Sequence, residues 1–310
     1  MHKYITGQRS ILKVDEQENG ERRLDMRVSL ERMKVTADQR SIALSIGTSD
    51  IGFALQTQNP ESLAQLLYSS ALFDSGAITN DISSLRIHYN LDNVALSTDL
   101  PDGQMPMDIR LGDGYFLFEV TPPQTESRDI MLSMGLGDFS IEGLPDLGAY
   151  QSVAQTVVQP FIPENAVFSF RFPDVTDVLW QGLVDMDGAL LLGEMANFPP
   201  LVFDDTFYSS PALSASIDGQ LALNTRAPLD VDGELQIVVQ DIENTISTFQ
   251  QGAQSDNTAL ARIFVAGALG TQIINSFGVQ HEDGGRLFRV TFPADSMPLI
   301  NDRPLPGLFF

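Results

Sequence analysis

Apolar and polar residues alternate with a period of two along much of this 310-residue chain, and this alternation limits its fold more than any other feature. Leu24, Met26 and Val28 are separated by charged residues, and the segments IALSI (42–46) and IGFALQT (51–57) continue the pattern. Successive side chains of a β-strand point to opposite faces, so the pattern predicts strands with one buried face. Strands of this kind, joined by short turns, form an antiparallel meander.

Two kinds of polar interruption predict where the strands turn. The segment GTSD (47–50) separates two apolar runs and resembles a turn. Asp-Gly dipeptides favour tight hairpins, because both residues adopt positive φ at low cost. We therefore expect hairpins at the dipeptides that begin at Asp113, Asp187, Asp218, Asp232 and Asp283.

Amphipathic helices are expected near residues 61–73, 148–158 and 241–277, and a short helix around the only tryptophan, Trp180. These elements predict an α+β protein: a mostly antiparallel, long and curved β-sheet, or two, covered on one side by amphipathic helices. The segment 258–277 is long enough to cross a bilayer, but it carries Arg262, Gln272 and Asn275. We expect it to pack on a sheet and the chain to have no transmembrane segment.

Three regions divide the chain. Residues 1–20 are polar and are expected to be a lead-in or an edge, 21–160 an N-terminal β-rich half, and 161–310 a C-terminal β-rich half with a helix pair. Pro160 and Pro163 place the junction between the halves, because the residue before a proline is driven out of helical conformation. The halves alternatively form one continuous domain.

Charge is the strongest signal in the composition. The formal net charge is -23, and half of the 18 basic residues lie in the first 40 positions. Such an acidic chain repels phosphate backbones, so no nucleic-acid partner is expected. Cysteine is absent, which excludes disulfides and thiolate metal sites. Residues 1–8 lack the apolar segment of an export signal, so we expect either a cytoplasmic protein or a fragment whose leader has been removed.

Catalytic and metal-binding patterns are not found. The only histidines are His2, His88 and His281, too few and too scattered for a histidine-based triad. Two carboxylate clusters lack the ligand spacing of a calcium loop, so turns are the preferred interpretation. We expect no catalytic residue, no metal and no cofactor. The two clusters consist of Asp185, Asp187 and Glu194, and of Asp230, Asp232 and Glu234.

Aromatic residues concentrate just after the proposed junction. Phe168, Phe170 and Phe172 alternate and therefore share one sheet face. One interpretation is a core between sheet and helices; the other is a groove for an acyl chain or another apolar ligand. The candidate ligand-binding residues are Phe168, Phe170, Phe172, Trp180, Phe198 and Phe203.

The second half of the chain resembles an uncharacterised family of exported alphaproteobacterial proteins, domain of unknown function 2125. The resemblance covers roughly residues 166–307 and includes the segments AVFSFRFPDVTDVLWQGLVDMDGAL and DGGRLFRVTFPADSMPLINDRPLP. The sequence departs from the family at Asp302, where glycine is usual. The family assigns no catalytic residue, so none is carried over. The residues at comparable places are Trp180, Asp187, Pro199, Pro200, Gly219, Gly233, Asn301 and Pro304.

The resemblance implies a periplasmic or cell-envelope location. With the aromatic face and the lack of a catalytic pattern, it favours a non-enzymatic binding or scaffold protein whose sheet–helix groove accepts an apolar ligand, such as a lipid. The alternative is a structural or assembly component that binds protein partners through sheet edges and an acidic surface. Protein partners and oligomeric state are left open.

Overall fold

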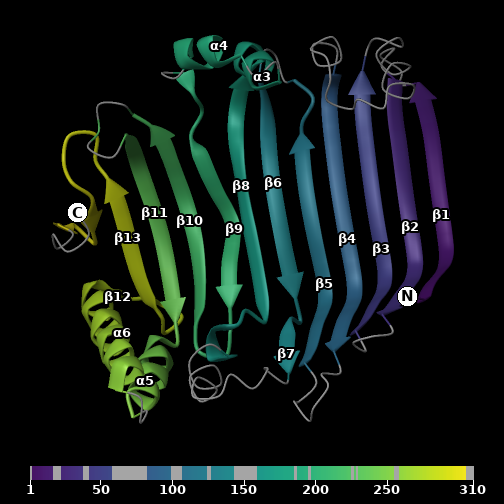
Figure 1. Cartoon of the computed structure of the whole chain (residues 1–310). Helices are drawn as coiled ribbons and strands as arrows, with labels where there is room; N and C mark the ends of the chain where they lie inside the picture. The colour runs from purple at the N-terminus through teal and green to yellow at the C-terminus, as the bar shows by residue number, and fades with distance from the viewer. Residues whose placement is uncertain are drawn as a thin grey trace.

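The computed structural model describes residues 2–16, 22–37, 42–57, 82–98, 107–123, 127–142, 159–184, 187–194, 197–224, 227, 230–254 and 258–304. In these residues all the strands belong to one antiparallel sheet with an open order, so the expected α+β class with a long antiparallel sheet is confirmed (Figure 1). The main path runs β1-β2-β3-β4-β5-β6-β8-β9-β10-β11-β13-β14-β15, with β7 on β5 and β12 on β13.

The long strands lie in the first two thirds of this path. They are β1 (His2–Glu16), β2 (Arg22–Ala37), β3 (Ile42–Thr57), β4 (Ile82–Thr98), β5 (Met107–Val120), β6 (Ser127–Gly137) and β8 (Asn165–Thr176). Shorter strands complete the sheet: β7 (Ser140–Glu142), β9 (Leu201–Ser209), β10 (Ser214–Leu223), β11 (Val231–Gln240), β12 (Val279–Gln280), β13 (Arg286–Phe292), β14 (Leu299–Ile300) and β15 (Arg303–Pro304).

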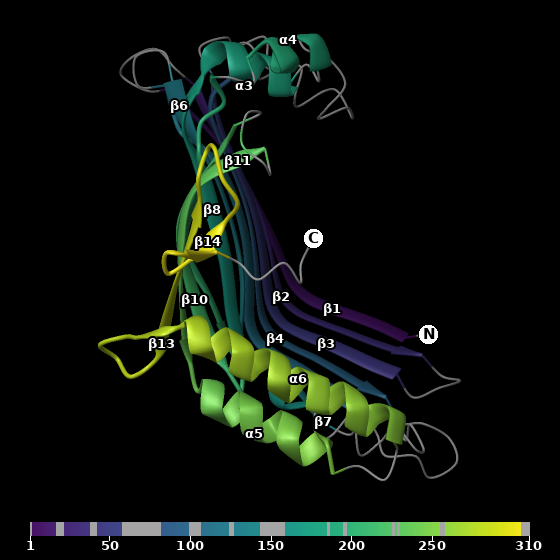
Figure 2. The ribbon, with the colours of Figure 1, turned by 90° about the vertical axis from the view of Figure 1, so that its left-hand side faces the viewer.

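Helices lie at the two ends of the sheet. The pair α3 (Asp177–Val184) and α4 (Gly188–Gly193) follows β8 at one end. The pair α5 (Ile242–Gly252) and α6 (Thr258–Phe277) follows β11 at the other end. A 3₁₀ turn at Gln159–Phe161 precedes β8. Figure 2 shows that the sheet is curved and that both pairs extend from its concave side. The expected helix pair and the helix around Trp180 are therefore confirmed, whereas the helices expected at 61–73 and 148–158 lie outside the described residues.

Several predicted turns are wrong, because the strands run straight through them. GTSD lies inside β3, and Asp113-Gly114 lies inside β5. Instead of ending strands, these polar positions are paired with β4, where Ser49 and Gly114 share the register partner Leu91. There Gly47 lies against Asn93, which has a φ of 53°, and Gly112 lies against Asp138, which has a φ of 50°.

Most of the other Asp-Gly hairpins are also absent. Asp187 begins α4, and its side chain accepts hydrogen bonds from the backbone N–H groups of Ala189 and Leu190. Gly219 lies inside β10 and Gly233 inside β11, at φ 134° and 139°. A Cβ on either glycine would lie 2.2 Å from a carbonyl oxygen of the neighbouring strand, so glycine allows this close approach. Only Asp283-Gly284 lies in a turn, before β13.

Positive φ outside glycine is confined to two residue types in the described part of the chain. All eight such residues are aspartate or asparagine, whose short polar side chains tolerate this left-handed conformation better than other side chains do. They occur within strands, between strands and at the start of α5. The eight are Asn93, Asp138, Asp174, Asp205, Asp230, Asp241, Asn301 and Asp302.

The two halves proposed from the sequence share this one sheet. β6 pairs directly with β8, across the segment that holds Pro160 and Pro163. Residues 2–16, expected to be a lead-in or an edge, form β1 at the edge of the sheet, where they pair with β2 alone.

Candidate functional site

The register brings apolar side chains of six strands into three parallel rows on one face of the sheet, the inner face. Each row crosses β2, β3, β4, β5, β6 and β8, and every neighbouring pair in it is a register pair. The first row is Leu24, Leu55, Leu85, Val120, Ile130 and Phe172. The second is Met26, Phe53, Ile87, Phe118, Leu132 and Phe170, and the third is Val28, Ile51, Tyr89, Phe116, Met134 and Phe168.

Burial falls from the first row to the third. Leu55 and Val120 of the first row are completely buried, and Val120 packs with Leu179 of α3. In the third row Ile51 is 48% exposed, and Met134 and Phe168 are each 42% exposed. Helix α3 lies on the concave side of the sheet (Figure 2) and covers the first-row end of the inner face. The apolar side chains of the third row lie beyond it and stay partly exposed.

Aromatic rings connect the exposed and the buried ends of this face. Phe168 contacts Phe203 with ring centroids 6.3 Å apart, and Phe170 with 5.4 Å. The series continues from Phe170 to Phe172 at 5.9 Å and from Phe172 to Phe198 at 5.8 Å, always edge to face. Such T-shaped contacts are the favoured geometry for aromatic pairs.

Trp180 lies at the buried end and belongs to the core. It is 9% exposed and clusters with Val120, Val175 and Leu179, while Phe172 and Phe198 pack against that cluster. The guanidinium carbon of the buried Arg128 lies 5.2 Å from the centroid of the indole ring. Arg128 also donates hydrogen bonds to the carbonyl of Ile82 and to Asp177, so its charge is paired. The structure therefore brings all six predicted residues together, with Phe168 exposed and Trp180 enclosed.

Sequence reasoning missed the part of the surface that comes from other strands. Ile51 and Met134 each belong to an alternating segment, so their orientation could have been expected. Their position beside Tyr89 and Phe168 depends on register, which the separate segments do not reveal.

At the opposite end of the sheet, α6 packs chiefly on α5. Phe264 is buried against Gly252 of α5, and Phe249 of α5 lies against Gly267. The sequence predicted that this segment packs on a sheet; its main contact is with α5, because the small residues Gly252 and Gly267 let the two helices approach each other closely. No described helix combines the length and the apolarity needed to cross a membrane.

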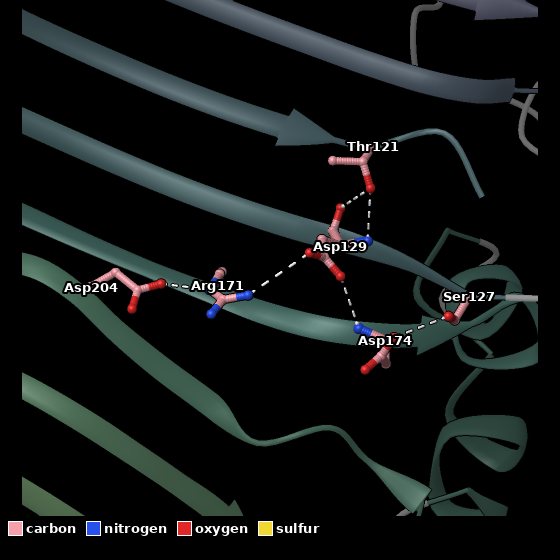
Figure 3. Close-up of polar contacts among 6 residues, drawn as sticks. All are labelled: Thr121, Ser127, Asp129, Arg171, Asp174 and Asp204. Atoms are coloured by element: carbon pink, nitrogen blue, oxygen red, sulfur yellow. Dashed lines mark hydrogen bonds and ion pairs between the residues drawn. The ribbon is translucent and has the colours of Figure 1, made fainter. Parts of the chain in front are cut away.

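The outer face, on the other side of the sheet, is polar. Figure 3 shows Arg171 of β8 between two aspartates. Its Nε lies 2.5 Å from Asp204, and an Nη lies 3.9 Å from Asp129. The side chain of Asp129 also accepts a hydrogen bond from the backbone N–H of Asp174. The carboxylate of Asp174 accepts one from the hydroxyl of Ser127, and the hydroxyl of Thr121 accepts one from the backbone N–H of Asp129. Hydrogen bonding to Asp204 and the nearby carboxylates raise the pKa of Arg171.

A second polar cluster on this face includes His88. Asp50 accepts hydrogen bonds from Arg27 at 2.6 Å and Ser29 at 2.7 Å, and its other oxygen lies 3.2 Å from Nε2 of His88. Burial alone would raise the pKa of Asp50, but these hydrogen bonds outweigh it and hold that pKa below its ordinary value. Ser29 bonds the carboxylate and not the imidazole, so the cluster lacks the order of a nucleophilic triad.

Asp185 of the first predicted carboxylate cluster lies outside the described residues. No group of three possible metal ligands is found among the residues that the structure describes. Asp187 caps α4, and Asp232 accepts a hydrogen bond from Asn224. A scan against protein-family models, a search of curated proteins and a search of solved structures each found no match. Any function must therefore be argued from the site itself.

Proposed function

We propose that the chain is a non-enzymatic binding or scaffold protein of the cell envelope whose concave inner face accepts an apolar ligand, such as the acyl chain of a lipid. The observation that carries the proposal is the third row, where Ile51, Met134 and Phe168 remain 42–48% exposed, whereas Leu55 and Val120 of the first row are 0–1% exposed. Contiguous exposed apolar surface of this kind marks interaction sites in proteins. The envelope location rests on the resemblance alone.

The chemistry of the surface fits a flexible, apolar chain. Its side chains are aliphatic, aromatic and thioether groups, and methionine and aromatic rings adapt to ligands of different shape. Burial of an acyl chain against such a surface contributes about 0.8 kcal/mol for each methylene group removed from water. The third row crosses the strands from β3 to β8, so an acyl chain lying along it could contact several of its side chains.

Binding of the uncharged dye N-phenyl-1-naphthylamine, with and without oleate, tests this proposal. Phe168→Ser should weaken dye binding roughly tenfold, since burying one phenylalanine contributes about 1.5–3 kcal/mol and 1.4 kcal/mol is a factor of ten. Phe207→Ser is a matched control. Phe207 is 40% exposed on the next strand, but its register partner is Val167, whose side chain points to the outer face.

The control should bind dye as the unaltered chain does, and oleate should displace the dye. Extraction of the purified native protein should also release an acyl ligand, which a scaffold without a ligand would not retain. If the unaltered chain binds neither dye nor oleate, or if both substitutions weaken binding equally, the inner face is not the binding surface.

The alternative function, a structural component that binds protein partners, is favoured by the edge of the sheet. β1 is 15 residues long, and β2 is its only partner among the strands that the structure describes. A long open edge presents unpaired N–H and C=O groups to which another strand can add. Light scattering would support this function if the purified chain forms a stable oligomer without a bound acyl ligand.

A further inference from the structure

The outer face of β1 to β4 gathers positive charge in a chain whose net charge is -23. Register aligns Lys13 with Asp25, then Ala54, then Arg86, and the next row aligns Arg27 with Gly52 and His88. Among the described side chains of these two rows and their neighbours, five are cationic and three are carboxylates. The cations are Arg9, Lys13, Arg23, Arg27 and Arg86, and the carboxylates are Asp25, Asp50 and Glu119, the register partner of Arg86 on β5.

These side chains surround a groove of about 310 Å³, the basic groove. Gly52 and Ala54, which have no side chain and only a methyl group, lie among its lining residues. Lys13, Arg23 and Arg86 line it, together with the imidazole of His88. That imidazole lies over Gly52, since a methyl group there would come within 1.8 Å of its Cε1 atom.

Part of this charge is not neutralised within the protein. Arg23 pairs with Asp25 at 3.0 Å and Arg27 with Asp50 at 2.6 Å. Lys13 and Arg86 are exposed and form no ion pair with any other residue that the structure describes. Two strands lie between them in this row, carrying Asp25 and Ala54, so an anion held in the groove would have one of these cations on each side.

The charge on the outer face changes sign along the sheet. At β6 to β9 a single arginine, Arg171, is surrounded by Asp129, Asp174 and Asp204 (Figure 3). The same face is therefore positive at one edge and negative farther along. Such a field attracts an anion to the edge and repels it elsewhere, so the net charge of the whole chain does not describe this site.

We propose that the basic groove binds a phosphate group, as a free phosphate ester or as the headgroup of an anionic lipid. Arginine matches the oxygens of a phosphate with two parallel N–H donors, and lysine adds a compact charge. Arg86, Arg23 and Lys13 supply both kinds of donor around one cavity. The groove lies on the face opposite the apolar rows, so this inference does not depend on the apolar ligand.

Calorimetry with glycerol 3-phosphate and flotation with lipid vesicles test the proposal on the full chain. The double variant Lys13→Ser/Arg86→Ser should weaken binding of the anion roughly tenfold or more, because two charge-assisted contacts are lost. Arg289→Ser is the control, since Arg289 of β13 is also exposed but pairs with Glu234 of β11, far along the sheet. The control should bind as the unaltered chain does.

The two arms identify the source of the phosphate. Binding of glycerol 3-phosphate indicates a soluble ester. Flotation with vesicles that contain phosphatidylglycerol, but not with vesicles of phosphatidylcholine alone, indicates an anionic headgroup, and this binding should weaken as salt is added. The proposal is overturned if the unaltered chain binds neither, or if the double variant binds as tightly as the control. Equal melting temperatures of the variants would show that the fold is kept.

Discussion

Trp180→Ala removes the largest side chain at the closed end of the inner face. The ring is enclosed by Val120, Val175 and Leu179, which are 0–2% exposed, so little relaxation can fill the space it leaves. Truncation of buried aromatic residues costs about 3–5 kcal/mol. Loss of the contact with Arg128 adds about 0.5–2 kcal/mol. We therefore expect the free energy of unfolding to fall by about 3.5–7 kcal/mol.

Urea unfolding followed by circular dichroism measures this change, because the variant has no tryptophan left to report by fluorescence. Phe168→Ala is the comparison. Its ring is 42% exposed, so truncation should cost less than about 2 kcal/mol. The reasoning is refuted if Trp180→Ala costs under about 1 kcal/mol yet abolishes dye binding, since Trp180 would then line the ligand surface and not the core.

Three further predictions concern positions outside the apolar rows. Gly52→Ala should push the imidazole of His88 away from Asp50, because the new methyl would lie 1.8 Å from the ring; the His88 resonances in an NMR spectrum should shift and phosphate binding should change. Gly270→Ala should raise the free energy of unfolding by about 0.5–1 kcal/mol, because the residue lies inside α6 and a Cβ there meets no atom. The folded pKa of Asp50 lies below its unfolded value of about 3.9, so its contribution is present above about pH 4 and is lost as the pH falls through the folded pKa. The difference in stability between the unaltered chain and Asp50→Asn should accordingly shrink in acid, and a difference that grew there would contradict this sign.

Local pattern predicted the elements whose residues carry a complete signal. The strand that contains Leu24, Met26 and Val28, the helix around Trp180 and the α5–α6 pair follow from alternation or helical spacing within one segment. The length of the strands could not be predicted from local pattern. Gly47 and Asn93 are residue types common in turns, but they lie inside the bent strands β3 and β4. Whether such a residue ends a strand or bends it depends on the strand beside it, which the segment itself does not contain.

The candidate sites show the same division. The phenylalanines of β8 could be assigned to one face from their spacing, and Trp180 to their neighbourhood. The basic groove could not, although half of the basic residues lie in the first 40 positions. Arg86 comes from a strand more than 50 residues later, and only the pairing of β3 with β4 places it near Lys13.

Eight aspartates and asparagines have positive φ, so part of the acidity of this chain lies at positions where the backbone is left-handed. Six of them are aspartates, so some of the negative charge is present where the chain needs a left-handed residue. Replacement of another acidic residue removes its charge and its side-chain contacts but makes no demand on a left-handed backbone. At these six positions asparagine or glycine would keep the path of the chain, whereas alanine or lysine would remove the charge and strain the backbone.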